Sequence, residues 1–407
     1  MNLQLNNGNI RACVKTHAFC KLTQEKEEKI IMESTNHWVS IWGNAASISD
    51  NKPERYTKDM TLRYPIYVPF SGESIRLTFD NFNVTEDVKI SRVTVLYKGE
   101  FYPVLYNGER EMMIPAEGKI VTDALDIHVD ADETLEVSFY FGDYAQMRAS
   151  VVVTGPLSQG YYTNGDQTEN ANLNSATTRP TSQVYFLTNV SVLTEQENRA
   201  LVCFGDSITA QAWPDYLKLR CKEESFNHTA VIRRAVSGSR ILRQYDCIAY
   251  ECYGVSGDKR YPHDLPTDGA DTVIILHGIN DIIHPVGEEE NEFRPWSDLP
   301  TVEDLIEGFK EYVKLARELG YKVYAATLLP MAGWRTDAPF RQDIRHAYNE
   351  FLRTTDLVDG VIDFDKVMQN PSEPNRLNGE YDSGDHLHPG EVGHKKMAMI
   401  VPKEILK

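Results

Sequence analysis

Residues 200–208 read Ala200-Leu201-Val202-Cys203-Phe204-Gly205-Asp206-Ser207-Ile208. An apolar run that stops at a glycine predicts a buried strand, and such a strand delivers the next side chains into the crevice at the carboxyl edge of an open α/β sheet. Residues 208–220 predict a helix, so Ser207 lies at its amino end, where N–H groups and the helix dipole favour an anion. The stretch therefore predicts a nucleophilic serine at the end of a strand.

Strand-like and helical patterns alternate after Glu197. Thr301 and Asp304 predict a capping box, and Gly320 predicts a helix end. The expected strands are 201–204, 230–235, 272–276, 323–328 and 361–364, and the expected helices are 214–222, 302–319, 344–354 and 391–400. Strands separated by helices predict βαβ crossovers and a mainly parallel sheet with helices on both faces.

The first half of the chain has a different period. Short alternating runs rich in β-branched and aromatic residues, such as 75–79, 93–97 and 135–140, predict an all-β sandwich or jelly roll. A long polar stretch, 155–183, predicts a loop over or beside the active site. We therefore expect three regions: a polar N-terminal extension at 1–33, a β-sandwich or jelly-roll domain at 34–195, and a catalytic α/β domain at 196–407.

Length and charge limit the function. A chain of 407 residues predicts about two domains. The net charge of −18 argues against nucleic acid and membrane as partners, because phosphate binding needs a basic surface. The polar start at Met1 lacks the apolar core of a signal peptide, so we expect a cytoplasmic protein. Cys247 and Cys252 have no second pair of ligands, and we expect no metal.

Four segments of the second half carry a family resemblance: Gly205-Asp206-Ser207, Ser237-Gly238-Ser239, Gly278-Ile279-Asn280-Asp281 and Asp385-His386-Leu387-His388. In order and spacing they resemble the signature blocks of the SGNH or GDSL hydrolases. The strings 203–209 and 381–389, with the Trp-rich opening at 38–43, resemble the branch of arylesterases and acylhydrolases associated with xylan-degrading gene clusters, whose members carry an amino-terminal β domain. The resemblance implies a three-layer α/β/α, flavodoxin-like catalytic domain and no cofactor.

The same resemblance implies roles for particular residues. Ser207 would be the nucleophile, His388 the general base, and Asp385 the carboxylate that orients the imidazole. The backbone N–H groups of Ser207 and Gly238 and the side-chain amide of Asn280 would form the oxyanion hole.

Several alternatives stay open around this core. His386 is the rival base, and Asp385 would be dispensable if a backbone carbonyl oriented the histidine. Asp281 is expected to cap the helix that follows its strand. Ser239 stands where the branch is expected to carry asparagine, which weakens any hydrogen-bonding role at that position.

Four further residues are candidates for the substrate pocket: Asp206, His277, Trp213 and Trp334. Each has a structural alternative. Asp206 would brace its loop, His277 would fill a strand end, and the two tryptophans would pack in the core.

These residues and the resemblance predict a serine esterase that cleaves short acyl groups, most of all acetyl, from carbohydrate or aryl alcohols. Its expected partner is a small-molecule or oligosaccharide ester, and a homo-oligomer stays open. One alternative is a lipase or lysophospholipase, which would need an apolar groove for an acyl chain. The other is a carbohydrate-binding protein without catalysis, which would not require Ser207, Asp385, His388 and Asn280 together.

Overall fold

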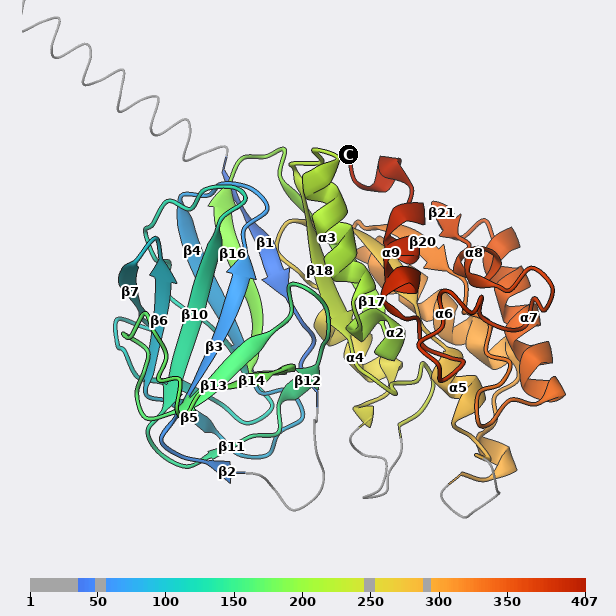
Figure 1. Cartoon of the computed structure of the whole chain (residues 1–407), viewed down its shortest axis with the longest axis horizontal. Helices are drawn as coiled ribbons and strands as arrows, with labels where there is room; N and C mark the ends of the chain where they lie inside the picture. The colour runs from blue at the N-terminus through green and yellow to red at the C-terminus, as the bar shows by residue number, and fades with distance from the viewer. Residues whose placement is uncertain (1–35, 48–55, 245–252, 288–293) are drawn as a thin grey trace, which may run out of the picture.

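The computed structural model describes residues 36–47, 56–244, 253–287 and 294–407 (Figure 1). The expected N-terminal extension at 1–33 lies outside these ranges, as do Cys247 and Cys252. Element labels follow Figure 1.

The amino-terminal region is a sandwich of antiparallel sheets. A four-stranded sheet has the order β1-β16-β4-β9, and a six-stranded sheet has the order β14-β13-β3-β10-β6-β7. The two sheets pack through alternate apolar side chains, and Phe79 and Phe139 meet edge to face with ring centroids 5.3 Å apart. This confirms the predicted β-sandwich.

The strands of the two main sheets are bounded as follows: β1 (His37–Gly43), β3 (Met60–Tyr67), β4 (Ser74–Asp80), β6 (Arg92–Tyr97), β7 (Glu100–Val104), β9 (Lys119–Val121), β10 (Thr134–Phe141), β13 (Gly160–Asn164), β14 (Arg179–Thr181) and β16 (Leu187–Thr194). Three short pairs complete the region: β2 (Tyr56–Thr57) with β11 (Ala145–Gln146), β5 (Val88–Ile90) with β8 (Met112–Ile114), and β12 (Ser150–Val152) with β15 (Gln183–Tyr185).

The polar stretch 155–183 was expected to be a loop, and this prediction is wrong. It contains β13 and β14, which extend the six-stranded sheet beyond β3. The guanidinium of Arg63 on β3 donates to the carbonyls of Gln167 and Asn170 at 3.0 and 2.8 Å, which fixes the connection between the two strands. The polar composition hid the strands because several of their side chains lie in solvent.

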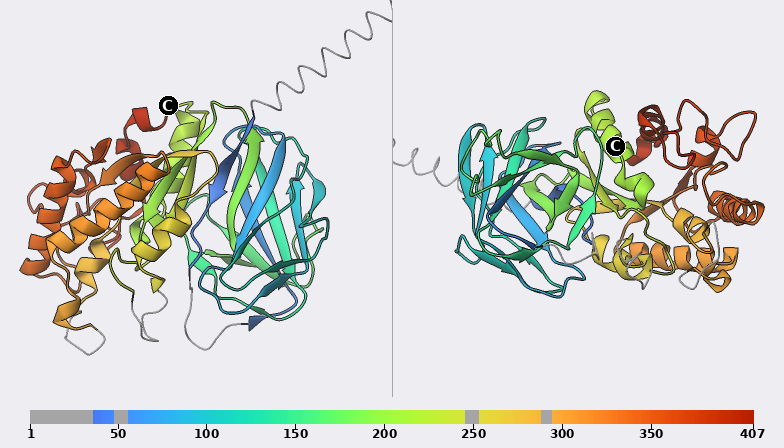
Figure 2. Two further views of the ribbon diagram at one scale, coloured as in Figure 1. Left: turned by 180° about the vertical axis from the view of Figure 1, so that it is seen from behind. Right: turned by 60° about the horizontal axis from the view of Figure 1, so that its bottom comes forward.

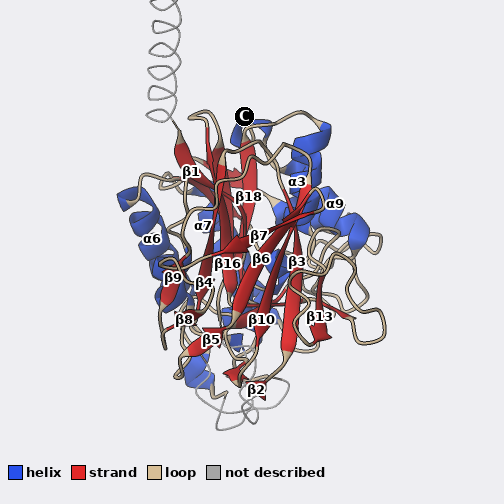
Figure 3. Cartoon of the chain, turned by 90° about the vertical axis from the view of Figure 1, so that its left-hand side faces the viewer, coloured by secondary structure: helices blue, strands red, loops and turns tan. Residues whose placement is uncertain are grey.

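The carboxyl-terminal region has a five-stranded parallel sheet in the order β18-β17-β19-β20-β21. Its strands are β17 (Arg199–Gly205), β18 (Thr229–Ala235), β19 (Ala270–Leu276), β20 (Lys322–Ala326) and β21 (Gly360–Ile362). Helices cover both faces, with α6 on one side and α3 and α9 on the other (Figures 2 and 3). This confirms the predicted three-layer α/β/α architecture.

The helices are α2 (Ser207–Ala210), α3 (Trp213–Glu223), α4 (Gly257–Asp264), α5 (Ile279–Ile283), α6 (Val302–Glu318), α7 (Pro339–Thr354), α8 (Phe364–Met368) and α9 (Glu391–Ile400), with 3-10 turns η2 (Trp296–Asp298) and η3 (Lys403–Ile405). The capping box of Thr301 and Asp304 begins α6, as predicted. The prediction of a single helix at 208–220 is wrong: the chain breaks after α2, and α3 begins at Trp213 with Pro214 in its first turn. Proline lacks an N–H and would disrupt a helix that continued through it.

The two regions share an apolar core across β1 and β18. Val39 of β1 belongs to the same buried cluster as Ala230 and Ile232 of β18. The guanidinium of Arg234 is buried in this interface and donates to the carbonyls of Asn44 and Thr188 at 2.6 and 2.7 Å. The sandwich is therefore packed directly against the edge strand of the parallel sheet.

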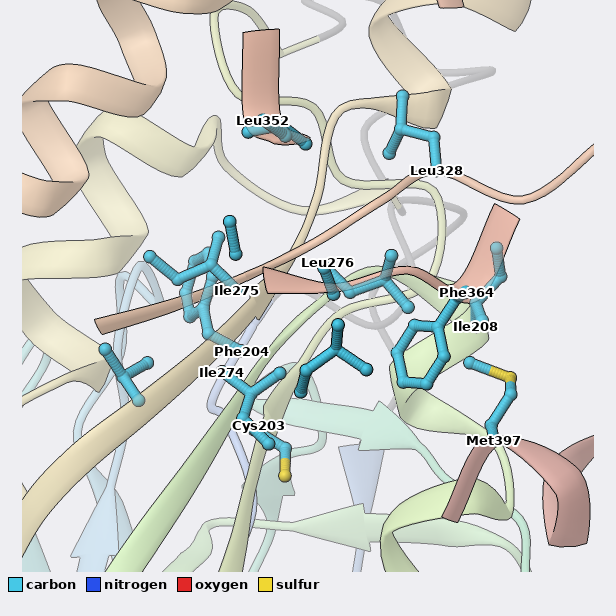
Figure 4. Packing of buried hydrophobic residues seen from close by; sticks show 14 of the residues in the cluster. Cys203, Phe204, Ile208, Ile274, Ile275, Leu276, Leu328, Leu352, Phe364 and Met397 are labelled. Atoms are coloured by element: carbon cyan, nitrogen blue, oxygen red, sulfur yellow. The ribbon is translucent and has the colours of Figure 1, made fainter. Parts of the chain in front are cut away.

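A second apolar core lies beneath the carboxyl ends of β17 and β19. Phe204, Ile208 and Leu276 pack there with Phe364 and Met397, all almost completely buried (Figure 4). This packing fixes the end of β17, and with it the position of the residues that follow Gly205. In the described ranges, no helix combines the length and apolar character that crossing a membrane requires.

Candidate active site

Three side chains from two distant segments meet beyond the carboxyl end of β17. The Oγ of Ser207 lies 2.8 Å from Nε2 of His388, and Nδ1 of His388 lies 2.6 Å from Oδ2 of Asp385. The structure therefore brings together the three residues for which the sequence predicts catalytic roles. Because the Asp385 carboxylate accepts the Nδ1 proton, Nε2 is left to accept the hydroxyl proton of Ser207.

Ser207 is held at the first turn of α2. Asp206 is the N-cap, and its Oδ1 accepts the N–H of Ile208 at 3.1 Å. Gly205 has no room for a side chain, since a Cβ there would lie 2.4 Å from the carbonyl oxygen of Leu276. The glycine therefore allows β17 and β19 to close tightly before the chain turns toward the nucleophile.

Asp385 and His388 lie on one tight loop. Oδ1 of Asp385 accepts the backbone N–H groups of Leu387 and His388 at 2.9 and 2.8 Å. Partial burial would raise the pKa of Asp385, but the hydrogen bonds from the backbone and ring of His388 and from Leu387 hold it below its ordinary value. The carboxylate is therefore ionised at neutral pH and suited to stabilise an imidazolium.

The rival base His386 has a separate partner. Its Nδ1 lies 2.6 Å from Oδ2 of Asp382. His386 adopts a left-handed backbone conformation, with φ of 67°. The histidine in contact with the serine is His388.

The three expected oxyanion donors differ in the hydrogen bonds that they already make. The backbone N–H groups of Ser207 and Gly238 donate to no acceptor in the described part of the chain. Nδ2 of Asn280 donates one hydrogen bond to the carbonyl oxygen of Ser239 at 3.0 Å. Since a side-chain amide has two N–H donors, the second is available for a substrate oxygen.

Gly238 is required at its position for two reasons. Its φ is 80°, in the left-handed region. A Cβ would also lie 2.2 Å from Cδ1 of Tyr253, whose ring covers the glycine. The ring of Tyr253 stacks in turn on His284, with centroids 4.8 Å apart. Tyr253 is thus an aromatic wall on the oxyanion loop that the sequence reasoning did not assign.

Asp281 was expected to cap its helix, but its side chain has other partners. Its carboxylate is fully buried and accepts the N–H groups of Ile241 and Leu242 at 2.7 and 3.1 Å. Burial raises the pKa of Asp281 to about 6. The residue ties the beginning of α5 to the segment that follows the Gly238 loop. These partners lie about forty residues earlier in the chain, and nothing in the sequence around Asp281 predicts them.

The predicted pocket residues divide into two groups. Trp334 borders the site, because its ring meets that of His388 edge to face at 6.0 Å. The other three pocket assignments are wrong. Trp213 is completely buried and packs on Phe364, His277 is buried between strand end and α6, and Asp206 is buried as the N-cap.

Asp206 has an unusual environment for a carboxylate. Its Oδ2 has no hydrogen-bond partner among the described residues. Burial raises the pKa of Asp206 to about 7. It is therefore a buried support of the nucleophile turn and does not reach substrate. Within the described ranges, histidine, cysteine and acidic side chains form no group of three that could hold a metal ion.

Comparison with known proteins agrees with this geometry. The model of the GDSL-like lipase/acylhydrolase family matches residues 203–396. No curated protein matches the chain.

Several solved structures resemble about half of the chain. A GDSL-like lipase from Bacteroides thetaiotaomicron is 18% identical over 52% of this chain and 90% of its own, with a TM-score of 0.37. An acetyl xylan esterase is 18% identical over 49% and 96%, with a TM-score of 0.35. A carbohydrate esterase of family 3 from Talaromyces cellulolyticus is 13% identical over 51% and 96%, with a TM-score of 0.35.

The parallel sheet, the serine at the end of β17 and the matched segment coincide. Residues 203–396 of this chain form a domain of the GDSL-like lipase/acylhydrolase family, a family of ester-hydrolysing enzymes.

Proposed function

We propose that this protein is a serine esterase that hydrolyses short acyl esters, above all acetyl esters, of carbohydrate or aryl alcohols. The observation that carries the proposal is the contact of 2.8 Å between Oγ of Ser207 and Nε2 of His388, with Asp385 at 2.6 Å on the other ring nitrogen. A serine hydroxyl needs such a base to act as a nucleophile at neutral pH.

The proposed reaction has two halves. Oγ of Ser207 attacks the ester carbonyl carbon while Nε2 of His388 takes the hydroxyl proton. The carbonyl oxygen becomes an oxyanion, held by the N–H groups of Ser207 and Gly238 and the second amide N–H of Asn280. Collapse breaks the bond to the alcohol, which leaves with the proton from His388. Water then attacks the acyl-enzyme, giving a proton to His388, and the second collapse releases the carboxylic acid and returns the proton to Ser207.

A short acyl group is supported by the wall over the oxyanion loop. An acyl carbonyl whose oxygen accepts the Gly238 N–H lies beside that residue, and the ring of Tyr253 rests directly on Gly238. A long acyl chain would have to displace this ring and its stack on His284. The preference for a carbohydrate or aryl alcohol rests on the resemblance of the signature strings and the β domain to the xylan-cluster branch.

The decisive experiment compares the full chain with its Ser207→Ala variant. Substrates are acetylated xylo-oligosaccharides and a series of nitrophenyl esters from acetyl to long acyl chains. We expect acetate release and a fall in kcat/KM with chain length, and a loss of about 10⁴-fold or more in Ser207→Ala. Ser372→Ala, at an exposed serine on another loop, is the matched control and should keep full activity.

Two outcomes would contradict the proposal. A Ser207→Ala variant within tenfold of the parent would remove the serine mechanism. A rate that rises with acyl length would favour the lipase alternative over the short-acyl esterase.

The carboxylate of the proposed triad has its own control on the same loop. Asp385→Asn should lose about 10³- to 10⁴-fold in kcat, because the asparagine no longer holds the productive tautomer of His388. Asp382→Asn removes the partner of His386 instead, and we expect a loss of less than tenfold. Equal losses in the two variants would mean that the whole loop, and not the Asp385 carboxylate, is what the serine requires.

A further inference from the structure

Beneath the proposed oxyanion hole lies a buried polar cluster that the mechanism above does not use. It consists of Ser239, His277, Arg260 and Tyr312, which we call the Ser239 cluster. All four residues are at most 2% exposed. Burying a polar group costs free energy unless the group is hydrogen-bonded, so we consider which partners these four residues have.

The carbonyl oxygen of Ser239 is the point of contact with the active site. It accepts Nδ2 of Asn280 at 3.0 Å and lies 3.1 Å from Nε2 of His277. A carbonyl can only accept, so Nε2 of His277 carries the proton. The orientation of the Asn280 amide is thereby fixed by the position of one backbone oxygen.

The other ring nitrogen of His277 has a partner that suits this tautomer. Nδ1 lies 3.1 Å from the hydroxyl of Tyr312 and, without a proton, accepts it. Burial and the neighbouring Arg260 hold the pKa of His277 well below its ordinary value, so the ring is neutral. A neutral ring with a fixed proton is a rigid donor to Ser239.

Arg260 connects the cluster to the two strand ends of the site. Its guanidinium donates to the hydroxyl of Ser239 at 3.3 Å, to the carbonyl of Gly205 at 2.8 Å and to that of Arg234 at 3.2 Å. It also lies over the ring of Phe204, 4.2 Å from the centroid. One side chain therefore links the end of β17, two residues before Ser207, to the loop that carries Gly238.

We propose that His277 and Arg260 are positioning residues that hold the Asn280 amide in the oxyanion hole through Ser239. The inference rests on the proposed function, in which Asn280 donates to the oxyanion. It also gives a role to the serine at 239: its hydroxyl accepts Arg260 and lies 3.0 Å from Nε2 of His277.

The test is a double-mutant cycle in the full chain. His277→Phe fits between the rings of Phe204 and Tyr312 and removes the donor to Ser239. Ser239→Ala removes the hydroxyl alone and is the milder variant if His277→Phe does not fold. Each is made in the parent and in an Asn280→Ala background, and kcat and KM are measured on nitrophenyl acetate.

We expect each single variant to lose about 10- to 100-fold in kcat with KM changed by less than threefold, since small displacements of a catalytic group cost rates of this order. In the Asn280→Ala background the same changes should cost less than threefold, because the group that they position is gone. Tyr321→Phe removes a buried hydroxyl that is bonded to Leu265 and Thr267 and, in the described part of the chain, to no member of the Ser239 cluster, so it should leave kcat unchanged.

Equal losses in the two backgrounds would overturn the proposal, because the cluster would then act on general stability or on another group. An Asn280→Ala variant with the kcat of the parent would also overturn it, by removing Asn280 from the oxyanion hole. Failure of the serine mechanism itself would be seen separately, in Ser207→Ala.

Discussion

His263 links the sandwich to the α/β region, and its charge should make stability depend on pH. Its Nε2 lies 2.9 Å from Asp80 of β4, and its Nδ1 lies 3.1 Å from Asp264 of α4. The ring also stacks on Phe82 with centroids 3.8 Å apart. Burial would lower the pKa of His263, but the hydrogen bonds to Asp264 and Asp80 raise it to about 9.

The sign and size of the effect follow from linkage. The folded pKa lies above the ordinary value of 6.5, so the stabilisation is fully present below about pH 6.5 and is lost as pH rises through about 9. One pKa unit is worth about 1.4 kcal/mol, so the full effect is about 3 kcal/mol. With an unfolding entropy of about 2.1 cal/mol/K per residue, this corresponds to about 4 °C in Tm for a chain of this length.

The assay is calorimetric Tm against pH from 6 to 10 for the parent and His263→Gln. The parent should exceed the variant most at pH 6, and the gap should narrow by about 4 °C toward pH 10. His128→Gln, at an exposed histidine that also lies between two carboxylates, is the matched control and should show a gap below 1 °C at every pH. A gap for His263→Gln that stays constant over this range would refute the assignment of the effect to its charge.

Two further predictions concern the glycine of the oxyanion loop and the two tryptophans near the site. Gly238→Ala should lower both kcat and Tm, because its Cβ would meet the Tyr253 ring. Gly99→Ala is the control: with a similar φ of 83° and open space around it, it should cost only about 1–2 kcal/mol of backbone strain and leave activity unchanged. Equal effects of the two variants on kcat would show that contact with Tyr253 does not matter. Trp213→Ala should destabilise the fold by about 3–5 kcal/mol in denaturant unfolding, because its ring is buried in the core. Trp334→Ala should change KM, measured from initial rates, with little effect on Tm, because its ring lies beside His388. A change of KM in Trp213→Ala at unchanged Tm would contradict the burial of Trp213 in the core.

The helices and strands of the α/β region could be predicted because their apolar periodicity is set by burial. Residues 302–319 and 391–400 were expected as helices and form α6 and α9 within one residue at each end. The candidate triad could be predicted because the segments 205–207 and 385–388 resemble the signature blocks of the SGNH or GDSL hydrolases, which assign the three roles. The residue spacing alone would have left His386 open as the base.

Contacts between distant segments could not be predicted in the same way. Trp213 lies close to Ser207 in sequence, yet the break after α2 turns its ring into the core against Phe364. Asp281 accepts N–H groups about forty residues earlier, and His277 reaches back equally far to Ser239. Partners of this kind depend on the register of neighbouring strands, which a single sequence does not specify.

The shared core of β1 and β18 limits how the two halves of this chain can be separated. Removing the sandwich would expose Ala230 and Ile232 to water and strip the Arg234 guanidinium of its acceptors at Asn44 and Thr188. We therefore expect a chain limited to the hydrolase half to fold poorly and to aggregate. Any replacement of the sandwich by another domain would need a surface that matches β18.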